Sequence, residues 1–149
     1  MKLILHFIMY GGSILSLGSE YHHQTFLPGV DDLSSGLGCF AMTELGHGSN
    51  IRALQTTATY VHDTREFIID TPHELAQKYW IGNALTATRA VVFAQLYLRE
   101  ECVGVHPFVV PLRDVDGNLL PGVRIWSCVL KGGMHGVDTG SCYTTAESP

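Results

Sequence analysis

Two short stretches of this chain carry the residue types needed to bind a planar heterocycle. Residues 38–50 read GCFAMTELGHGSN and residues 76–84 read AQKYWIGNA. The first stretch supplies hydroxyl groups, and the second supplies a broad aromatic face and a glycine that lets a ligand approach the backbone N–H groups. We therefore predict one binding surface made by both stretches. The positions that we single out are Thr43, Ser49, Trp80 and Gly82.

The two stretches resemble the flavin-binding part of the acyl-CoA oxidase and acyl-CoA dehydrogenase superfamily. The sequence CFAMTELGHGSN is closest to the oxidase branch, because family dehydrogenases usually carry Thr-Glu-Pro followed by Gly-Ser-Asp at these positions. Dehydrogenases also usually carry Ser or Thr where this chain has Gly82. The resemblance extends from about His6 to Gly140, which is nearly the whole chain.

The resemblance assigns roles to these positions, and each has a structural alternative. It implies that Thr43 hydrogen-bonds the flavin pyrimidine ring, that Gly82 approaches the reactive edge of the flavin with open space above the ring, and that Trp80 packs near the isoalloxazine. The alternatives are a strand-end threonine, a turn glycine and a core tryptophan. For Ser49, contact with the acyl-CoA and a role in holding the loop are equally compatible with the sequence.

The activity that the resemblance implies is that of an FAD-dependent acyl-CoA oxidase. Such an enzyme converts a fatty acyl-CoA to the trans-2-enoyl-CoA and passes the electrons to O₂, which gives H₂O₂. The resemblance implies that the catalytic base lies in a C-terminal helical domain beyond this chain, and that Glu44 is structural. We therefore expect no catalytic residue and no isolated activity here.

Location and assembly also follow from the resemblance. Family oxidases of this type are peroxisomal, although residues 147–149 form no Ser-Lys-Leu-type tripeptide. Full-length members usually form homodimers. Two other functions stay open: a non-catalytic flavin-binding fragment, and a secreted β-sandwich binding protein. The second is compatible with the apolar run Leu3–Leu17, which has the outline of a signal peptide.

Composition narrows the possible partners. Only nine Lys and Arg are scattered along the chain and the formal charge is −5, so we expect no nucleic-acid partner. The four Cys show no CxxC spacing and are read as reduced thiols. We also expect no metal site, because neither HxxxH nor CxxC occurs among the His and Cys residues. The run Leu3–Leu17 is too short, and too interrupted by glycine, for a membrane span.

The remaining pattern predicts a mainly β fold, a small β-barrel or sandwich preceded by a short helical segment. We place the end of a helical domain and a linker at 1–36, a flavin-binding β domain at 37–140, and a divergent tail at 141–149. For Leu3–Leu17 we favour a buried helix over a signal peptide, and a helix or turn is expected at 20–26. A turn is expected around His135. The predicted strands cover residues 39–43, 54–61, 66–70, 90–98, 104–112 and 123–130.

Overall fold

One long strand organises the fold. The computed structural model describes residues 1–133 and 136–145, and at its centre lies β5 (Arg89–Leu98). β6 (Glu101–Pro111) pairs antiparallel along the whole length of β5. β1 (Gly38–Ala41) and β2 (Thr57–Val61) both pair parallel with β5, at opposite ends, and therefore share its other edge. β3 (Glu66–Asp70) completes this sheet as the hairpin partner of β2.

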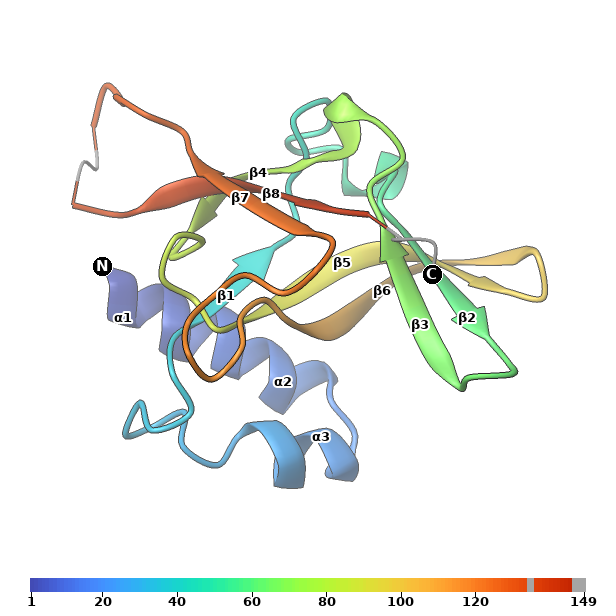
Figure 1. Ribbon diagram of the computed structural model, residues 1–149, viewed down its shortest axis with the longest axis horizontal. Coiled ribbons are helices and arrows are strands. Elements are labelled where there is room, and N and C mark those ends of the chain that lie inside the picture. Colours follow the sequence, from blue (N-terminus) through green and yellow to red (C-terminus); the bar gives the residue numbers. More distant parts are fainter. Residues whose placement is uncertain (134–135, 146–149) are drawn as a thin grey trace.

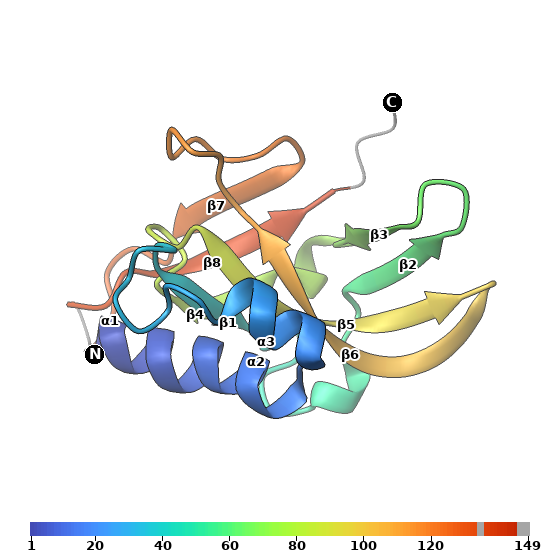
Figure 2. The same ribbon diagram turned by 90° about the horizontal axis from the view of Figure 1, so that it is seen from below.

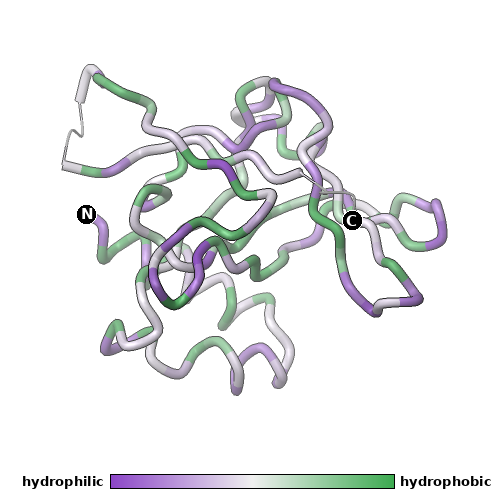
Figure 3. Tube along the Cα trace, in the orientation of Figure 1, coloured by the Kyte–Doolittle hydropathy of each residue, from purple (hydrophilic) through white to green (hydrophobic). Residues whose placement is uncertain are grey.

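A second, three-stranded sheet packs against the first (Figure 1). Its strands are β4 (Lys78–Gly82), β8 (Thr139–Thr144) and β7 (Val123–Ser127), with β8 in the middle and antiparallel to both neighbours. The two open sheets confirm the prediction of a mainly β fold in its sandwich form. The polar hairpin tips, at His62–Arg65 and near Arg99, project away from the sheets (Figure 3).

The side chains of β5 alternate between two apolar clusters, which explains its nearly continuous apolar sequence. Ala90 and Val92 face the second sheet, where they pack in one cluster with Ile81. Val91 and Phe93 belong to the other cluster, formed with the helical layer. A strand with both faces buried needs no polar alternation. The predicted strand at residues 90–98 is confirmed.

The helical layer is one long N-terminal helix followed by a short one. The long helix consists of α1 (Lys2–Ile4), a π-helical segment at Leu5–Gly11 and α2 (Gly12–Leu17), and α3 spans Glu20–Phe26 (Figure 2). Both helices were predicted. The long helix is buried on one face alone, although a buried helix was predicted. Its inward side chains are four residues apart and therefore line a single face, which leaves the other face uncovered. The inward side chains are His6, Tyr10 and Ile14, and the exposed ones include Leu3, Ile4, Ile8, Leu15 and Leu17.

His6 ties this helix to the loop and strand beside it. Its Nδ1 accepts a hydrogen bond from the Gly38 N–H at 2.9 Å, so Nε2 carries the proton and donates to the Val30 carbonyl at 2.8 Å. Tyr10 packs so closely on Gly38 that a side chain there would overlap the Tyr10 ring. Both contacts hold the start of β1 against the helix. In the described part of the chain, no helix combines the length and the apolar character that crossing a membrane requires.

The predicted tail is corrected in part. We placed the end of the β domain at residue 140, but Ser141–Thr144 form most of β8. The segment looked too polar for a strand, yet each polar residue there except Tyr143 is buried between β4 and β7, where backbone pairing stabilises it. The shorter β7 ends at Ser127 rather than at 130. His135 and residues 146–149 lie outside the described residues.

Replacement of His6 by Leu tests the role of this side chain. We expect His6→Leu to lower the free energy of unfolding by about 2–4 kcal/mol, because it leaves a buried N–H and a buried carbonyl without a partner. Urea denaturation followed by circular dichroism measures the change. The matched control His73→Leu, at an exposed position, should change stability by less than about 0.5 kcal/mol. Equal effects of both variants would contradict this assignment.

Candidate functional site

The structure brings the two predicted stretches into direct contact. The Tyr79 N–H donates to the Thr43 carbonyl at 2.9 Å, and the Thr43 hydroxyl donates to the Tyr79 carbonyl at 2.5 Å. An antiparallel bridge between Glu44 and Lys78 continues this pairing. Thr43 therefore does serve as a strand-end residue. Its hydroxyl oxygen still has acceptor lone pairs after donating its proton, so the structural role and a ligand contact are compatible.

Trp80 lies next to this contact and points out of the core. The register between β4 and β8 shifts between Lys78 and Ile81, and Trp80 sits in that irregularity with a φ of 66°. Its side chain is 61% exposed, so the alternative of a core tryptophan is wrong. An extra residue in a strand redirects side chains in this way. A non-glycine residue with positive φ is also backbone strain of the kind that concentrates at functional sites.

Gly82 lies at the end of β4, where the N-terminal helix covers it. A Cβ atom at this position would overlap the Leu5 side chain and contact Val137. The expected open space is therefore filled on the Cβ side, because the helix packs directly on the glycine. A ligand contact of Gly82 through its backbone stays a prediction.

Ser49 belongs to a loop that is held mainly by backbone hydrogen bonds. Glu44 and His47 exchange two backbone hydrogen bonds of 3.1 Å, and the Leu45 N–H donates to the Gln77 carbonyl at 3.0 Å. Ser49 itself is exposed on this loop. Its side chain is therefore available to a ligand, and its role stays a prediction.

A buried ion pair fixes the contact between the two stretches. The Glu44 carboxylate and the Lys78 ammonium are 3.0 Å apart, and each residue is 2% exposed. Glu44 also accepts hydrogen bonds from the Gln55 and Thr56 N–H groups and from the Thr56 hydroxyl, at 2.8, 2.9 and 2.6 Å. Lys78 donates further to the carbonyls of Met42 and Phe93, at 3.2 and 2.6 Å. Every charged group here is hydrogen-bonded, as burial requires.

These contacts set the protonation of both groups. Burial raises the pKa of Glu44, but the hydrogen bonds from Thr56 and the charge of Lys78 outweigh it and hold that pKa below its usual value. Burial lowers the pKa of Lys78, and the Glu44 carboxylate opposes this shift. A carboxylate held ionised by four donors is a poor base, so Glu44 has the structural role that the sequence resemblance implied.

Lys78 and Thr56 were missed at the sequence level. A lysine within the strand KYWIG gives a weak signal, since an isolated lysine in a strand usually points to solvent. Its partner Glu44 is 34 residues away, and Thr56 is 12 residues from Glu44. No local pattern links them.

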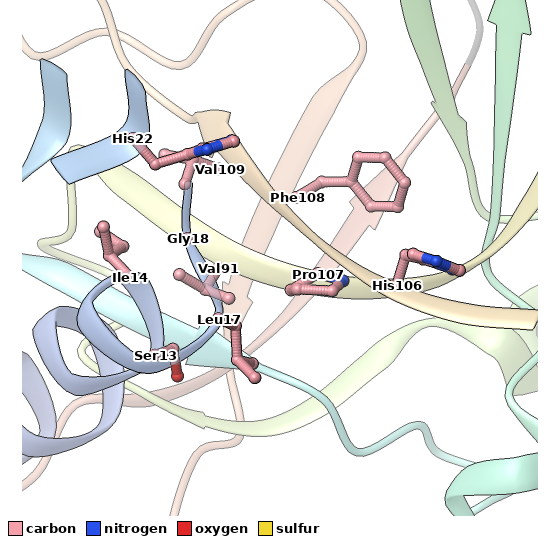
Figure 4. A pocket seen from close by; sticks show the side chains of 10 residues that line it. All are labelled: Ser13, Ile14, Leu17, Gly18, His22, Val91, His106, Pro107, Phe108 and Val109. Carbon is pink, nitrogen blue, oxygen red and sulfur yellow. The ribbon is translucent and has the colours of Figure 1, made fainter. Parts of the chain in front are cut away.

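A further pocket lies apart from these residues (Figure 4). It is a small apolar cavity of about 170 Å³ between α2 and β6, with Ile14, Val91 and Val109 on its walls. His22 and His106 lie at its two ends in Figure 4. None of the four predicted site residues lines it.

The fold and the paired stretches define a β-sandwich domain with a helix packed on one side. Residues 39–146 match the acyl-CoA dehydrogenase middle domain, so the chain belongs to this family. The peroxisomal acyl-coenzyme A oxidase 3 of Arabidopsis thaliana is 46% identical over 144 residues, which cover 96% of this chain and 21% of that protein.

Solved structures give the same result. Acyl-CoA oxidase 1 from Yarrowia lipolytica superposes with a TM-score of 0.94 at 44% identity, over 97% of this chain and 22% of that one. Acyl-CoA oxidase-1 of Caenorhabditis elegans, complexed with FAD and ATP, gives a TM-score of 0.91 at 35% identity, over 97% and 22%. The chain thus resembles acyl-CoA oxidases and spans about one fifth of the length of these relatives.

Removal of one partner of the buried pair tests its contribution. We expect Lys78→Met to lower the free energy of unfolding by about 3–5 kcal/mol, because it leaves a buried carboxylate unpaired. The double variant Glu44→Gln/Lys78→Met should be more stable than Lys78→Met alone. The control Lys2→Met removes the more exposed pair with Asp138 and should change stability by about 0–1 kcal/mol. If Lys78→Met behaved like Lys2→Met in urea denaturation, the pair would not be a main constraint.

The lowered pKa of Glu44 predicts a loss of stability in acid. Because the folded-state pKa lies below the unfolded value of about 4.3, the stabilisation by this group is complete above that value. It is lost as the pH falls through the folded-state pKa. Unfolding free energies of the wild type and of Glu44→Gln, measured between pH 7 and pH 3, should converge toward the acid end. A constant difference over the whole range would contradict the assignment.

Proposed function

We propose that this chain supplies part of the flavin-binding surface of an FAD-dependent acyl-CoA oxidase. The observation that carries the proposal is the direct pairing of Thr43 with Tyr79. This pairing places the segment that contains the Thr43 hydroxyl beside the exposed ring of Trp80. Family membership and the FAD complex of a relative support it.

The hydrogen-bonding and aromatic groups of these residues are of the kinds that bind a flavin. The Thr43 oxygen keeps lone pairs that can accept from a ring N–H, and Trp80 offers a flat surface free of core packing. We propose that Ser49, on the exposed loop, forms the solvent-exposed end of the same flavin-binding surface. Gly82 contributes through its backbone, since Leu5 occupies the space at its Cβ side.

The proposed overall reaction is oxidation of a fatty acyl-CoA to the trans-2-enoyl-CoA, with O₂ reduced to H₂O₂. When bound, FAD supplies the two-electron acceptor. This chain would position the ring, while the proton acceptor would come from outside the chain, because Glu44 is held ionised within the ion pair. The peroxisome is the proposed location and a homodimer the proposed assembly of the full-length enzyme.

A flavin-binding measurement tests the role of Thr43. We expect the purified chain to bind flavin mononucleotide weakly and Thr43→Val to weaken this binding about fivefold to tenfold, since one hydrogen bond is worth about 1 kcal/mol. Flavin fluorescence quenching gives the affinity. Thr43→Ser should restore it, and Thr59→Val, at an exposed position of β2, serves as the control. Equal affinities of Thr43→Val and the wild type would reject the contact.

A turnover assay tests the assignment of the base. The purified chain, supplied with FAD and palmitoyl-CoA, should release no H₂O₂ above a protein-free control, because Glu44, the only carboxylate within residues 38–50 and 76–84, is held in the ion pair with Lys78. Peroxide release that depends on the protein would contradict this part of the proposal.

A further inference from the structure

The outer face of the long N-terminal helix is apolar and exposed. The inward residues His6, Tyr10 and Ile14 are four positions apart, so the residues midway between them lie on the opposite, outer face. Figure 2 shows that this helix lies along one edge of the molecule. Between 39% and 65% of each large apolar residue on the outer side is exposed, and these residues include Leu3, Ile4, Phe7, Ile8 and Leu15.

No charged side chain interrupts this outer face. Residues 3–19 contain no Lys, Arg, Asp or Glu, and their single histidine, His6, points inward. Lys2, at the start of the helix, pairs with Asp138 at 3.1 Å. A helix that lies on a membrane surface carries Lys and Arg beside its apolar face, so this face is poorly suited to a membrane. Exposed apolar patches on a protein mark contacts with other proteins.

The residues around Gly12 make the outer face self-complementary. Gly12 lies midway between two inward residues, and a Cβ atom there would make an ordinary contact of 3.8 Å with the Phe7 carbonyl oxygen of the same helix, so the position is open. Ile8 and Leu15 flank Gly12 at nearly equal distances along the helix. Two antiparallel helices related by a two-fold axis near Gly12 would therefore place Ile8 of each copy against the partner's Leu15. A glycine at the crossing point lets the two helices approach closely.

The exposed area is enough for a weak dimer. The five large residues offer roughly 500 Å² on each copy, so two copies would bury about 1,000 Å² in total, the lower bound for a specific interface. The chain has a formal charge of −5, and two copies of it repel each other. This repulsion is smallest where the copies meet on a face without charge.

We propose that this chain forms a two-fold symmetric dimer through the outer face of its long helix. The two helices run antiparallel and cross at Gly12, and the contact removes their exposed apolar side chains from water. The inference goes beyond the proposed flavin contact and does not depend on it, because none of the four predicted site residues belongs to this helix.

Sedimentation velocity of the full chain over a range of concentrations tests the proposal. We expect a monomer–dimer equilibrium with a dissociation constant of roughly 10 µM to 1 mM, since small interfaces bind weakly. Ile8→Glu should weaken dimerisation about tenfold or more, because it places a charge in an apolar contact. Gly12→Leu should do the same by keeping the helices apart, although the free chain has room at this position.

Two controls accompany these variants. Val115→Glu changes an apolar residue that is fully exposed outside the helix, and it should leave the equilibrium unchanged. Circular dichroism verifies that each variant is folded. FMN binding should be the same in Ile8→Glu and the wild type, so failure of this inference and failure of the flavin proposal are distinguishable.

A mixture of two variants tests the antiparallel register. Ile8→Glu and Leu15→Lys should each be monomeric alone, and an equimolar mixture should dimerise, because the introduced carboxylate then faces the introduced ammonium group. A chain that stays monomeric at about 1 mM, assembly beyond a dimer, or a mixture that stays monomeric overturns the proposal. Equal association of the wild type, Ile8→Glu and Gly12→Leu does the same. Binding to phosphatidylcholine–phosphatidylserine vesicles without self-association would identify a membrane as the partner instead.

Discussion

The buried pair of Glu44 and Lys78 is the interaction on which the arrangement of the site depends. It joins the segment after β1 to the first residue of β4, and through the Phe93 carbonyl it also reaches the central strand. A lysine brought into the core requires a compensating charge and compensating hydrogen bonds. The pair and its hydrogen-bond partners come from four separate segments, at residues 42–44, 55–56, 78 and 93, so the pair sets how those segments lie relative to one another.

The position of Trp80 follows from this constraint. Lys78 must point inward to reach Glu44, and Ile81 must point inward to reach the apolar cluster. Two inward residues separated by three positions do not fit the regular alternation of a strand. The irregularity between them absorbs the extra residue and turns Trp80 to the surface with positive φ. The exposure of the Trp80 ring is thus a consequence of the inward positions of Lys78 and Ile81 on either side of it.

The sequence predicted the strands better than the site. Apolar runs and turn residues located β5, the β2–β3 hairpin and both helices, because these signals are local. Ser141–Thr144 were missed because their strand is defined by pairing with β4 and β7 rather than by alternation. The exposed Trp80, the covered Gly82 and the Glu44–Lys78 pair each depend on residues that are distant in sequence. Motif matching placed the two stretches together, but it could not show which atoms face a ligand.

Hydrogen–deuterium exchange is the most direct measurement of whether the ion pair holds the two stretches together. The amide of Tyr79 donates to Thr43, and the amide of Thr56 donates to Glu44. In Glu44→Gln, we expect both amides to lose protection together, while amides of β5 paired with β6 keep theirs. Retained protection at Tyr79 despite loss at Thr56 would show that the two stretches are held in place by something other than this pair.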